Sequence, residues 1–346
     1  MQFYDLVIHS VDRLTSKAVN VQLKIPSELT SVFQFVPGQY ITINYTTQEG
    51  QELRRSYSLS NLPGQETLQL GIKELDKGAL FSAIANRQLK AGEVLRVSAP
   101  EGRFTYTAPE GSKVLALAAG SGITPVLSIA RSLLETQERS SLLLLYGNTD
   151  ASNVMYASVL QELQERFPER LTIKQIFSRK NDGDYFGRID KAVIHHSTKA
   201  SGGIDAFDLA YLCGPEAMIH ESKAVLSASG MPEASIRFEL FTASSEVNEV
   251  ATEGAVEITV QLDNQTYTVH GDANEFVLDL LLEEGIDAPY SCQGGTCSSC
   301  ICKITEGSAA MERNQVLTDK EIEQGYLLSC QAKATSAKLS IDFDEV

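Results

Sequence analysis

The chain lacks several features that define large classes of protein. It has no tryptophan and only 7% aromatic residues, which excludes a stacking platform for single-stranded nucleic acid. No apolar run approaches the about 18 residues of a membrane-spanning helix, and the start MQFYDLVIHSVDRL has neither the basic nor the apolar segment of a secretory signal. The five histidines show no metal-ligand spacing. With 346 residues, we expect a cytoplasmic protein of two or three domains that binds neither nucleic acid nor membrane.

Positive charge is scarce, above all near the C-terminus. The whole chain has 45 acidic and 29 basic residues and a net charge of −16. Residues 250–346 hold 17 acids and 5 bases, a balance of −12, whereas the first 249 residues hold 28 and 24, a balance of −4. An acidic surface repels nucleic acid and anionic membrane, and it can steer a basic partner. It can equally serve solubility alone.

Five of the six cysteines lie in the acidic part of the chain, and four of them have a recognisable spacing. Cys292, Cys297 and Cys300 form a C-x4-C-x2-C pattern, and Cys330 follows well downstream. This is the spacing by which plant-type [2Fe–2S] clusters are held. Zinc sites more often pair two C-x2-C units, and disulfide frameworks belong to small secreted chains. We therefore predict that these four cysteines bind a [2Fe–2S] cluster, which suits the reducing cytoplasm.

The order of apolar patterns divides the chain into parts. In residues 1–106, short alternating runs separated by Gly- and Pro-containing turns predict a β-barrel. Their ranges are 18–25, 40–45, 56–60, 68–72 and 94–99. In residues 107–241, strand-like runs alternate with helical periodicity, which predicts a parallel sheet with helices on both faces. Those strands are 114–118, 142–147, 172–177 and 209–213, and the helices are 125–137 and 157–166.

The remaining residues predict a linker and a small third domain. Residues 242–254 are small, polar and acidic, as in a flexible linker. In residues 255–346, strands at 256–262 and 265–269 flank the turn pair Asp263-Asn264. A helix follows at 275–284, capped by Asp272 or Asn274, and a last strand is expected at 338–343.

A motif on a barrel strand suggests a flavin site. Arg55 opens the strand, where a guanidinium suits a phosphate, and Tyr57 on the same face suits a flavin ring. Ser58 offers a hydroxyl or amide to the N5 edge of the flavin. Downstream, Gly78 and Ser82 open a predicted helix, a position that suits a pyrophosphate, and Lys73 precedes them. Arg55, Tyr57 and Ser58 also fit an alternative without a flavin, namely a surface strand with a buried tyrosine.

Two loops suggest a dinucleotide site. Gly120, Gly122, Thr124 and Pro125 follow the strand at 114–118, where a tight turn aims backbone amides at a dinucleotide. Pro125 stands where the Rossmann pattern has its third glycine. Cys213-Gly214 ends another strand, and Met218 lies in the helix that follows. Open α/β sheets bind substrates at such strand ends, although Cys213 also fits a buried packing residue and Met218 simple helix packing.

Taken in this order and spacing, the motifs resemble the ferredoxin–NADP reductase superfamily. With a ferredoxin module at the C-terminus, the chain is similar to the reductase component of phenylacetyl-CoA epoxidase and its relatives. This resemblance implies an antiparallel β-barrel for FAD, an α/β parallel-sheet domain for the nucleotide and an α+β β-grasp ferredoxin domain. The further matches are Ile176-Phe177-Ser178, Phe186-Gly187-Arg188-Ile189-Asp190, Met231-Pro232 and Gly325-Tyr326-Leu327-Leu328-Ser329-Cys330-Gln331.

The resemblance also implies roles for single residues. Arg55, Tyr57, Ser58, Lys73, Gly78, Ser82 and Phe241 would bind FAD, and Gly120, Gly122, Thr124, Pro125, Cys213, Gly214 and Met218 would line the NAD(P)H site. Cys213, Ser58, Tyr57 and Glu239 would surround the hydride transfer as catalytic residues. The implied activity is an NAD(P)H-dependent reductase that passes electrons through FAD and the cluster to an oxygenase. The acidity of residues 250–346, in turn, predicts a basic docking patch on that oxygenase.

Three questions stay open at this point. Ser178 and Arg179 favour NADPH through its 2′-phosphate, whereas Asp150 could repel that phosphate, so NADH stays possible. The acceptor could instead be a ring-hydroxylating oxygenase, a desaturase or a hybrid-cluster protein. A redox sensor without turnover is the remaining alternative.

Overall fold

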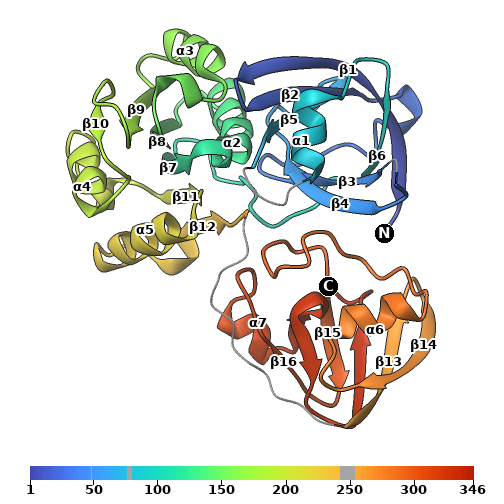
Figure 1. Ribbon diagram of the computed structural model, residues 1–346. Coiled ribbons are helices and arrows are strands. Elements are labelled where there is room, and N and C mark those ends of the chain that lie inside the picture. The colour runs from blue at the N-terminus through green and yellow to red at the C-terminus, as the bar shows by residue number, and fades with distance from the viewer. Residues whose placement is uncertain (48, 76–79, 242–253) are drawn as a thin grey trace. The chain divides into compact units, whose positions relative to one another are not determined.

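The computed structural model describes residues 1–47, 49–75, 80–241 and 254–346 (Figure 1). Gly78 and the predicted linker, except for Gly254, lie outside the described residues. The chain divides into two compact units, with the division between Phe241 and Thr242. No helix in the described ranges is long and apolar enough to cross a membrane.

The first sheet is the predicted antiparallel barrel, with the strand order β4-β3-β6-β1-β2-β5. Its strands are β1 (Phe3–Thr15), β2 (Ala18–Lys24), β3 (Tyr40–Thr46), β4 (Glu52–Ser58), β5 (Thr67–Lys73) and β6 (Val94–Ser98). A bridge between Leu59 and Leu70 joins the two edges of the sheet and closes the barrel. Strand β1 was not predicted, because only Leu6, Ile8 and Thr15 in it are buried and its apolar alternation is therefore weak.

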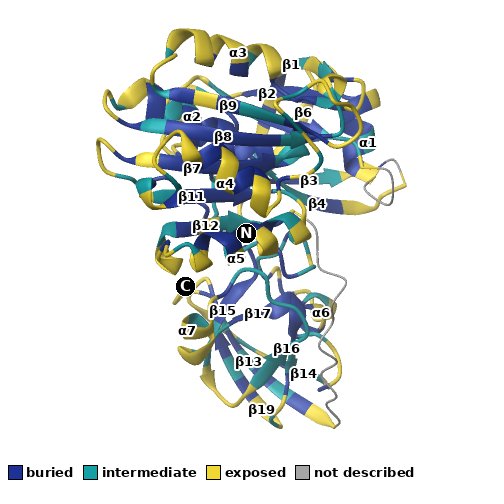
Figure 2. Ribbon diagram, turned by 90° about the vertical axis from the view of Figure 1, so that its left-hand side faces the viewer, coloured by how far each residue is buried: buried dark blue, intermediate teal, exposed yellow. Residues whose placement is uncertain are grey.

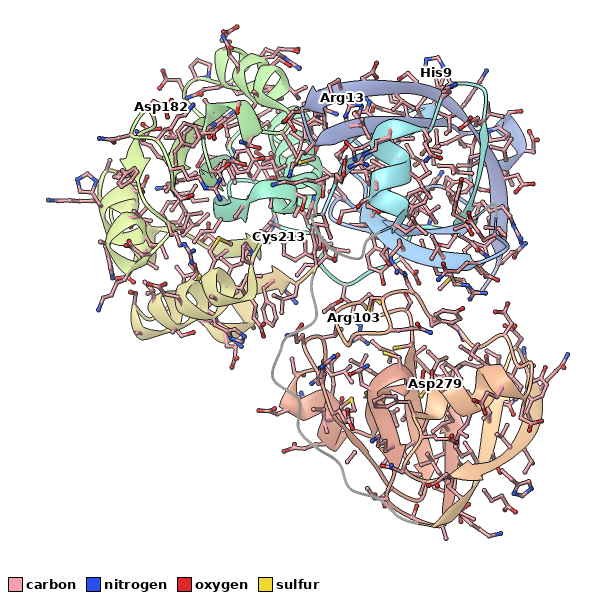
Figure 3. All side chains as sticks on the ribbon, in the orientation of Figure 1. His9, Arg13, Arg103, Asp182, Cys213 and Asp279 are labelled. Carbon is pink, nitrogen blue, oxygen red and sulfur yellow. The ribbon has the colours of Figure 1, made fainter. Side chains whose placement is uncertain are left out.

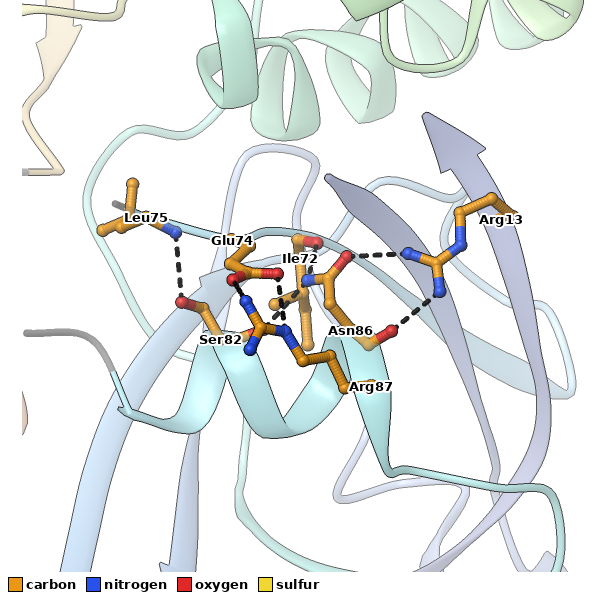
Figure 4. A network of polar contacts seen from close by, with 7 residues as sticks. All are labelled: Arg13, Ile72, Glu74, Leu75, Ser82, Asn86 and Arg87. Carbon is orange, nitrogen blue, oxygen red and sulfur yellow. Dashed lines mark hydrogen bonds and ion pairs between the residues drawn. The ribbon is translucent and has the colours of Figure 1, made fainter. Parts of the chain in front are cut away.

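Helix α1 (Leu80–Arg87) is fixed to the barrel by one buried amide (Figure 4). The Asn86 side chain donates to the carbonyl oxygens of Ile72, at 3.1 Å, and Ser82, at 2.9 Å. Arg13 on β1 donates to the side-chain oxygen of Asn86, at 3.1 Å, and to its carbonyl oxygen, at 2.7 Å. The helix is thus held against both β1 and β5.

The second sheet is the predicted parallel sheet, with the order β10-β9-β8-β7-β11-β12. Its strands are β7 (Lys113–Ala119), β8 (Ser141–Asn148), β9 (Leu171–Phe177), β10 (Tyr185–Phe186), β11 (Leu209–Cys213) and β12 (Ile236–Glu239). Helices α2 (Ile123–Thr136) and α3 (Ala157–Arg166) pack on one face, and α4 (Lys191–Lys199) and α5 (Glu216–Ala228) pack on the other. Figure 2 shows the buried strands between helices whose outer faces are exposed.

Tyr156 joins the barrel to the parallel sheet. It precedes α3 in a left-handed conformation, with φ of 59°, which is uncommon for an aromatic residue. Its hydroxyl donates to the side-chain oxygen of Asn20 at 3.0 Å and lies 2.9 Å from Oγ of Ser60. A Cβ on Gly71 would lie 2.7 Å from the same hydroxyl. Any side chain at position 71 of β5 would therefore clash with Tyr156, which explains the glycine there.

The C-terminal unit has a mixed sheet with the order β14-β13-β19-β15-β17. Its strands are β13 (Ala255–Leu262), β14 (Gln265–Asp272), β15 (Ile301–Glu306), β17 (Tyr326–Leu328) and β19 (Lys338–Asp342), with β16 (Ala309–Met311) and β18 (Ala332–Ala334) as a separate pair. Strands β13 and β19 are parallel, and the other pairs are antiparallel. Helix α6 (Val277–Glu283) packs on the core, and α7 (Asp319–Glu323) precedes β17. The predicted α+β fold is confirmed.

Two local predictions in this unit had different outcomes. Asp263 and Asn264 have φ of 52° and 59° and make the tight turn between β13 and β14, as the sequence indicated. The predicted cap of α6 was wrong, because Phe276 occupies the N-cap position. The Asp272 carboxylate instead accepts the backbone N–H of Asn274 at 2.9 Å, which stabilises the preceding turn.

Candidate functional site

The predicted dinucleotide residues lie at the point where the strand order of the parallel sheet reverses. The chain runs from β7 outward to β8 on one side, and it returns to place β11 on the other side of β7. Gly120 follows β7. Cys213, which is labelled in Figure 3, ends β11. Ligands of open α/β sheets bind at such a switch point, beyond the carboxyl ends of the strands.

The glycines at these two strand ends are closely packed, Gly122 against backbone and Gly214 and Gly120 against side chains. A Cβ on Gly122 would lie 2.0 Å from the carbonyl oxygen of Cys213, and one on Gly214 would lie 2.7 Å from Cε of Met218. Gly120 has φ of +54°, and a Cβ there would lie 3.2 Å from Nζ of Lys73. The structure therefore brings Lys73, at the end of β5, to the glycine loop.

Helix α2 starts directly after this loop. The hydroxyl of Thr124 donates to the carbonyl oxygen of Ser121 at 2.9 Å. Pro125 lies in the first turn of α2, where its missing N–H breaks no helical hydrogen bond. Both residues are buried and fix the loop in place. The backbone amides of the loop therefore lie at the start of α2, the position that favours an anion.

Ser58 and Glu239 meet between the barrel and the parallel sheet. The hydroxyl of Ser58 donates to Oε2 of Glu239 at 3.3 Å. Burial raises the pKa of Glu239 from its ordinary value of 4.5 to about 8, although the Ser58 hydrogen bond lowers it. Burial also raises the pKa of the fully buried Cys213 thiol, and the nearby Glu239 adds to this. At neutral pH, Glu239 is therefore mostly protonated and Cys213 is an uncharged thiol.

The other predicted flavin residues differ in how far the protein itself satisfies them. The Tyr57 ring packs on Phe81, with centroids 5.8 Å apart, and burial raises the pKa of its hydroxyl. Arg55 donates to the carbonyl oxygen of Arg54 at 2.7 Å, which uses only part of its guanidinium. The Ser82 hydroxyl is buried and accepts the N–H of Leu75 at 3.3 Å. Phe241 is 41% exposed.

The predicted phosphate residues lie at the neighbouring strand ends. Ser178 and Arg179 follow β9, and their N–H groups donate to the carbonyl oxygens of Asn148, at 3.0 Å, and Thr149, at 2.9 Å. Both side chains are exposed. Oδ1 of Asp150 accepts the N–H of Ser152 at 3.0 Å and its hydroxyl at 2.5 Å, and these bonds lower the pKa of Asp150. Asp150 thus caps a short 3-10 helix that the sequence did not predict.

The four predicted ligand cysteines form two pairs. No three His, Cys, Asp or Glu side chains in the described ranges are arranged around one metal ion. Cys292 and Cys297 share a hydrogen bond that lowers the pKa of Cys292 and raises that of Cys297. The sulfurs of Cys300 and Cys330 lie 3.3 Å apart, and both are free thiols. Two thiol pairs are the ligand set that two irons require.

The loop around these cysteines is shaped for close approach. Gly294 donates its N–H to the Cys292 sulfur at 3.3 Å. Gly295 has φ of +74°, and a Cβ there would lie 3.1 Å from the carbonyl oxygen of Arg313. The fifth cysteine of this region, Cys302, is fully buried in the apolar core, where burial raises its pKa. The loop thus fits a [2Fe–2S] cluster held by the four predicted cysteines.

Sequence reasoning did not identify two of the contacts near these sites. Tyr156 and Asn20 are 136 residues apart, and Arg313 and Gly295 belong to different loops. The available signals were an aromatic residue, Tyr156, before a predicted helix and a single arginine, Arg313, in the acidic stretch. Neither signal indicates which residue is contacted.

Family comparisons assign each part of the chain. Residues 5–106 match the oxidoreductase FAD-binding domain, residues 116–224 the oxidoreductase NAD-binding domain, and residues 260–335 the 2Fe-2S iron-sulfur cluster binding domain. The chain is 36% identical to one of the subunits of 1,2-phenylacetyl-CoA epoxidase from Escherichia coli (strain K12), with 99% of this chain and 98% of that protein covered. It is 30% identical to the 3-ketosteroid-9-alpha-monooxygenase ferredoxin reductase component of Rhodococcus rhodochrous, with 98% and 96% covered.

Solved structures share the fold. Phthalate dioxygenase reductase matches with a TM-score of 0.61 and 23% identity over 99% of this chain and 98% of that chain. An intact type IV self-sufficient cytochrome P450 monooxygenase matches with a TM-score of 0.71 and 19% identity over 98% of this chain, which spans 41% of that longer protein. The chain is therefore an oxidoreductase whose cofactors are FAD, a nicotinamide nucleotide and a [2Fe–2S] cluster. It belongs to the ferredoxin–NADP reductase superfamily, in the group whose members carry a C-terminal [2Fe–2S] ferredoxin domain.

Proposed function

We propose that this chain is the reductase component of a multicomponent oxygenase, and that its partner is the oxygenase component of phenylacetyl-CoA epoxidase. The observation that carries this proposal is the 36% identity to a component of the Escherichia coli epoxidase over 98% of the length of that component. When bound, the nucleotide supplies an electron pair, FAD splits the pair into single electrons and the cluster carries them one at a time. We assign these tasks to residues 1–106, 107–241 and 255–346.

For the flavin we propose the roles that the resemblance implied. Arg55 has guanidinium donors left for a phosphate after its bond to Arg54. Tyr57 and Phe241 offer aromatic surfaces to the flavin ring, and Ser58 offers its hydroxyl to the N5 edge. Gly78 and Ser82 would hold the pyrophosphate near the start of α1. Glu239 would hold a proton beside Ser58, because its pKa is raised to about 8.

For the nucleotide we propose the crevice between β7 and β11. Gly120, Gly122, Thr124 and Pro125 would present loop amides to it, and Cys213, Gly214 and Met218 would form its opposite wall. The amine of Lys73 beside Gly120 supports an anionic ligand there. A buried, uncharged Cys213 suits a wall for the nicotinamide ring and not a nucleophile.

We further propose that NADPH is preferred to NADH. The exposed Arg179 offers a fork of donors to a 2′-phosphate, and Ser178 offers a hydroxyl. The carboxylate of Asp150 is engaged by Ser152 and Asn153, and the positive charge of Lys180 also lowers its pKa. Asp150 therefore opposes the phosphate less than a free carboxylate would.

The partner and the compartment complete the proposal. The acidity of residues 250–346 suits docking on a basic patch of the oxygenase. We place the protein in the cytoplasm, where reducing conditions keep free thiols such as these available for a cluster.

Reconstitution with a purified oxygenase tests the proposal. The chain, the phenylacetyl-CoA epoxidase oxygenase component, NADPH, dioxygen and phenylacetyl-CoA should give epoxide and water, with one NADPH consumed for each epoxide formed. A Rieske-type ring-hydroxylating oxygenase with its own substrate serves as the control acceptor. Faster turnover with the control than with the epoxidase would reject this partner, and NADPH oxidation that reduces neither would reject the reductase role.

A further inference from the structure

The segment around Arg313 lies against both parts of the cluster site. Glu312 donates its N–H to the carbonyl oxygen of Gln331, next to Cys330, at 2.9 Å. Gln315 donates its N–H to the carbonyl oxygen of Gly295, between Cys292 and Cys297, at 3.1 Å. Arg313 lies between these two hydrogen bonds, and a Cβ on Gly295 would lie 3.3 Å from Cβ of Arg313. The backbone of Arg313 is therefore fixed beside the cysteine loop.

The charge of Arg313 is not compensated by an acidic partner. It is the only arginine in residues 250–346. Three of the four lysines of that stretch form ion pairs, namely Lys303 with Glu345, Lys333 with Glu312 and Lys338 with Glu257. Arg313 makes no ion pair within the described ranges, and its buried Nε atom has no hydrogen-bond partner there.

The neighbouring acid does not neutralise Arg313. Glu312 forms a 2.8 Å ion pair with Lys333, and both of these side chains are mostly buried, at 16% and 12% exposure. A guanidinium stays charged at every pH at which the protein is folded. Arg313 is thus a fixed positive charge in a stretch, residues 250–346, whose balance is −12.

We propose that Arg313 raises the reduction potential of the [2Fe–2S] cluster. Reduction adds one electron and hence one negative charge, which a nearby positive charge stabilises. Net charge and hydrogen bonds around such clusters set their potentials, and the surrounding acids act in the opposite direction. The electron comes from the reduced flavin of the same chain and leaves to the acceptor protein, and Arg313 itself gains and loses nothing. The effect does not depend on which oxygenase is the partner.

The test is an anaerobic redox titration of the full-length FAD- and cluster-loaded protein, followed by the EPR signal of the reduced cluster. Arg313→Gln and Arg313→Met remove the charge, and Arg313→Lys keeps it. We expect the neutral variants to lower the equilibrium constant for one-electron reduction about tenfold, a shift of about 59 mV to lower potential. Arg313→Lys should stay near the wild-type potential.

Lys338→Gln is the matched control, because it also removes one positive charge. Lys338 begins β19. The other end of that strand, Asp342, lies opposite Lys303 in the neighbouring strand β15, close in sequence to Cys300. Four strand residues at about 3.3 Å each separate the two ends by about 13 Å. The control should leave the potential unchanged. Neutral Arg313 variants with the wild-type potential, or a control shift equally large, would overturn the proposal. Loss of the cluster in both neutral variants would also overturn it, because Arg313 would then serve the loop structure.

Discussion

The hydroxyl of Ser58 lies 3.3 Å from Oε2 of Glu239, although 181 residues separate them in the chain. Ser58 ends a barrel strand and Glu239 ends a strand of the parallel sheet, so this hydrogen bond crosses from one sheet to the other. It joins the regions to which the flavin and the nicotinamide are assigned. It also places a carboxyl group with a pKa of about 8 at their junction.

The raised pKa of Glu239 predicts a pH-dependent stability. The folded state favours the protonated form of Glu239. The contribution of Glu239 to the free energy of unfolding is therefore fully present below pH 4.5 and is lost as the pH rises through about 8. Glu239→Gln should therefore be increasingly favoured over the wild type between pH 5.5 and 8.5. Urea unfolding followed by far-UV circular dichroism at both pH values measures the difference. Ser58→Ala removes the hydrogen bond that lowers the pKa of Glu239, so it should move the loss of stability to higher pH. A stability difference between Glu239→Gln and the wild type that does not change with pH would contradict the raised pKa of Glu239.

The cysteine pairs predict that the cluster can be removed alone. Cys297→Ser should abolish the [2Fe–2S] EPR signal, because serine does not replace the thiolate, and retain FAD, because residues 2–241 form a separate compact unit. NADPH should still reduce ferricyanide, while electron transfer through the cluster fails. Cys302→Ser is the control and should keep the signal, since Cys302 lies in the apolar core. A normal signal in Cys297→Ser would remove this residue from the ligand set.

The exposed Arg179 predicts the coenzyme preference. Arg179→Ala should lower kcat/KM for NADPH about ten- to a hundredfold, as expected for loss of a hydrogen-bonded charge contact of about 1.5–3 kcal/mol. The value for NADH should change little. Lys199→Ala, an exposed cation at the end of α4, is the control for general charge effects. Equal losses with both coenzymes would mean that Arg179 has another role.

The hydroxyl of Tyr156 predicts a stability effect. Tyr156→Phe leaves Asn20 and Ser60 without this partner in a buried position, which costs about 1–3 kcal/mol. The urea midpoint of the FAD-loaded protein should fall. Tyr185→Phe is the control, because that hydroxyl bonds His196 at an exposed site. If both variants unfold at the wild-type midpoint, the buried bonds of Tyr156 contribute nothing net.

The sequence predicted most of the architecture for identifiable physical reasons. Apolar periods of two and of 3.6 indicated the barrel, the parallel sheet and helix α3, whose bounds were predicted as 157–166 and observed as Ala157–Arg166. Helix α4 was missed because its sequence, KAVIHHSTK, has a weak apolar face. The [2Fe–2S] motif was recognisable because three of its four predicted cysteines lie within residues 292–300, whereas the Ser58–Glu239 contact depends on tertiary structure. Asp150 was expected to oppose the phosphate, but its cap on Ala151–Asn153 could not be inferred from composition.

The acidity of the C-terminal domain predicts salt-dependent electron transfer to the partner. Glu275, Asp279 and Glu283 are exposed and spaced four apart, and Asp279 and Glu283 lie on α6, which packs against the Ser329–Gln331 segment that carries Cys330. Because exposed charges are screened beyond about 8–10 Å at physiological salt, transfer to the oxygenase should slow between about 20 and 300 mM salt. Reduction of the flavin by NADPH should change much less. Stopped-flow absorbance measures both steps.

Neutralising the acidic face should have the same effect as salt. The triple variant Glu275→Gln, Asp279→Asn and Glu283→Gln should slow transfer at low salt and lose most of the salt dependence, because a steered encounter limits the rate. The control neutralises three exposed acids of the other unit, Glu162, Glu165 and Glu169, and removes the same charge. If the control slows transfer as much as the triple variant, net charge matters and not this face. If neither does, the acidity serves solubility, and the docking surface lies elsewhere on the protein.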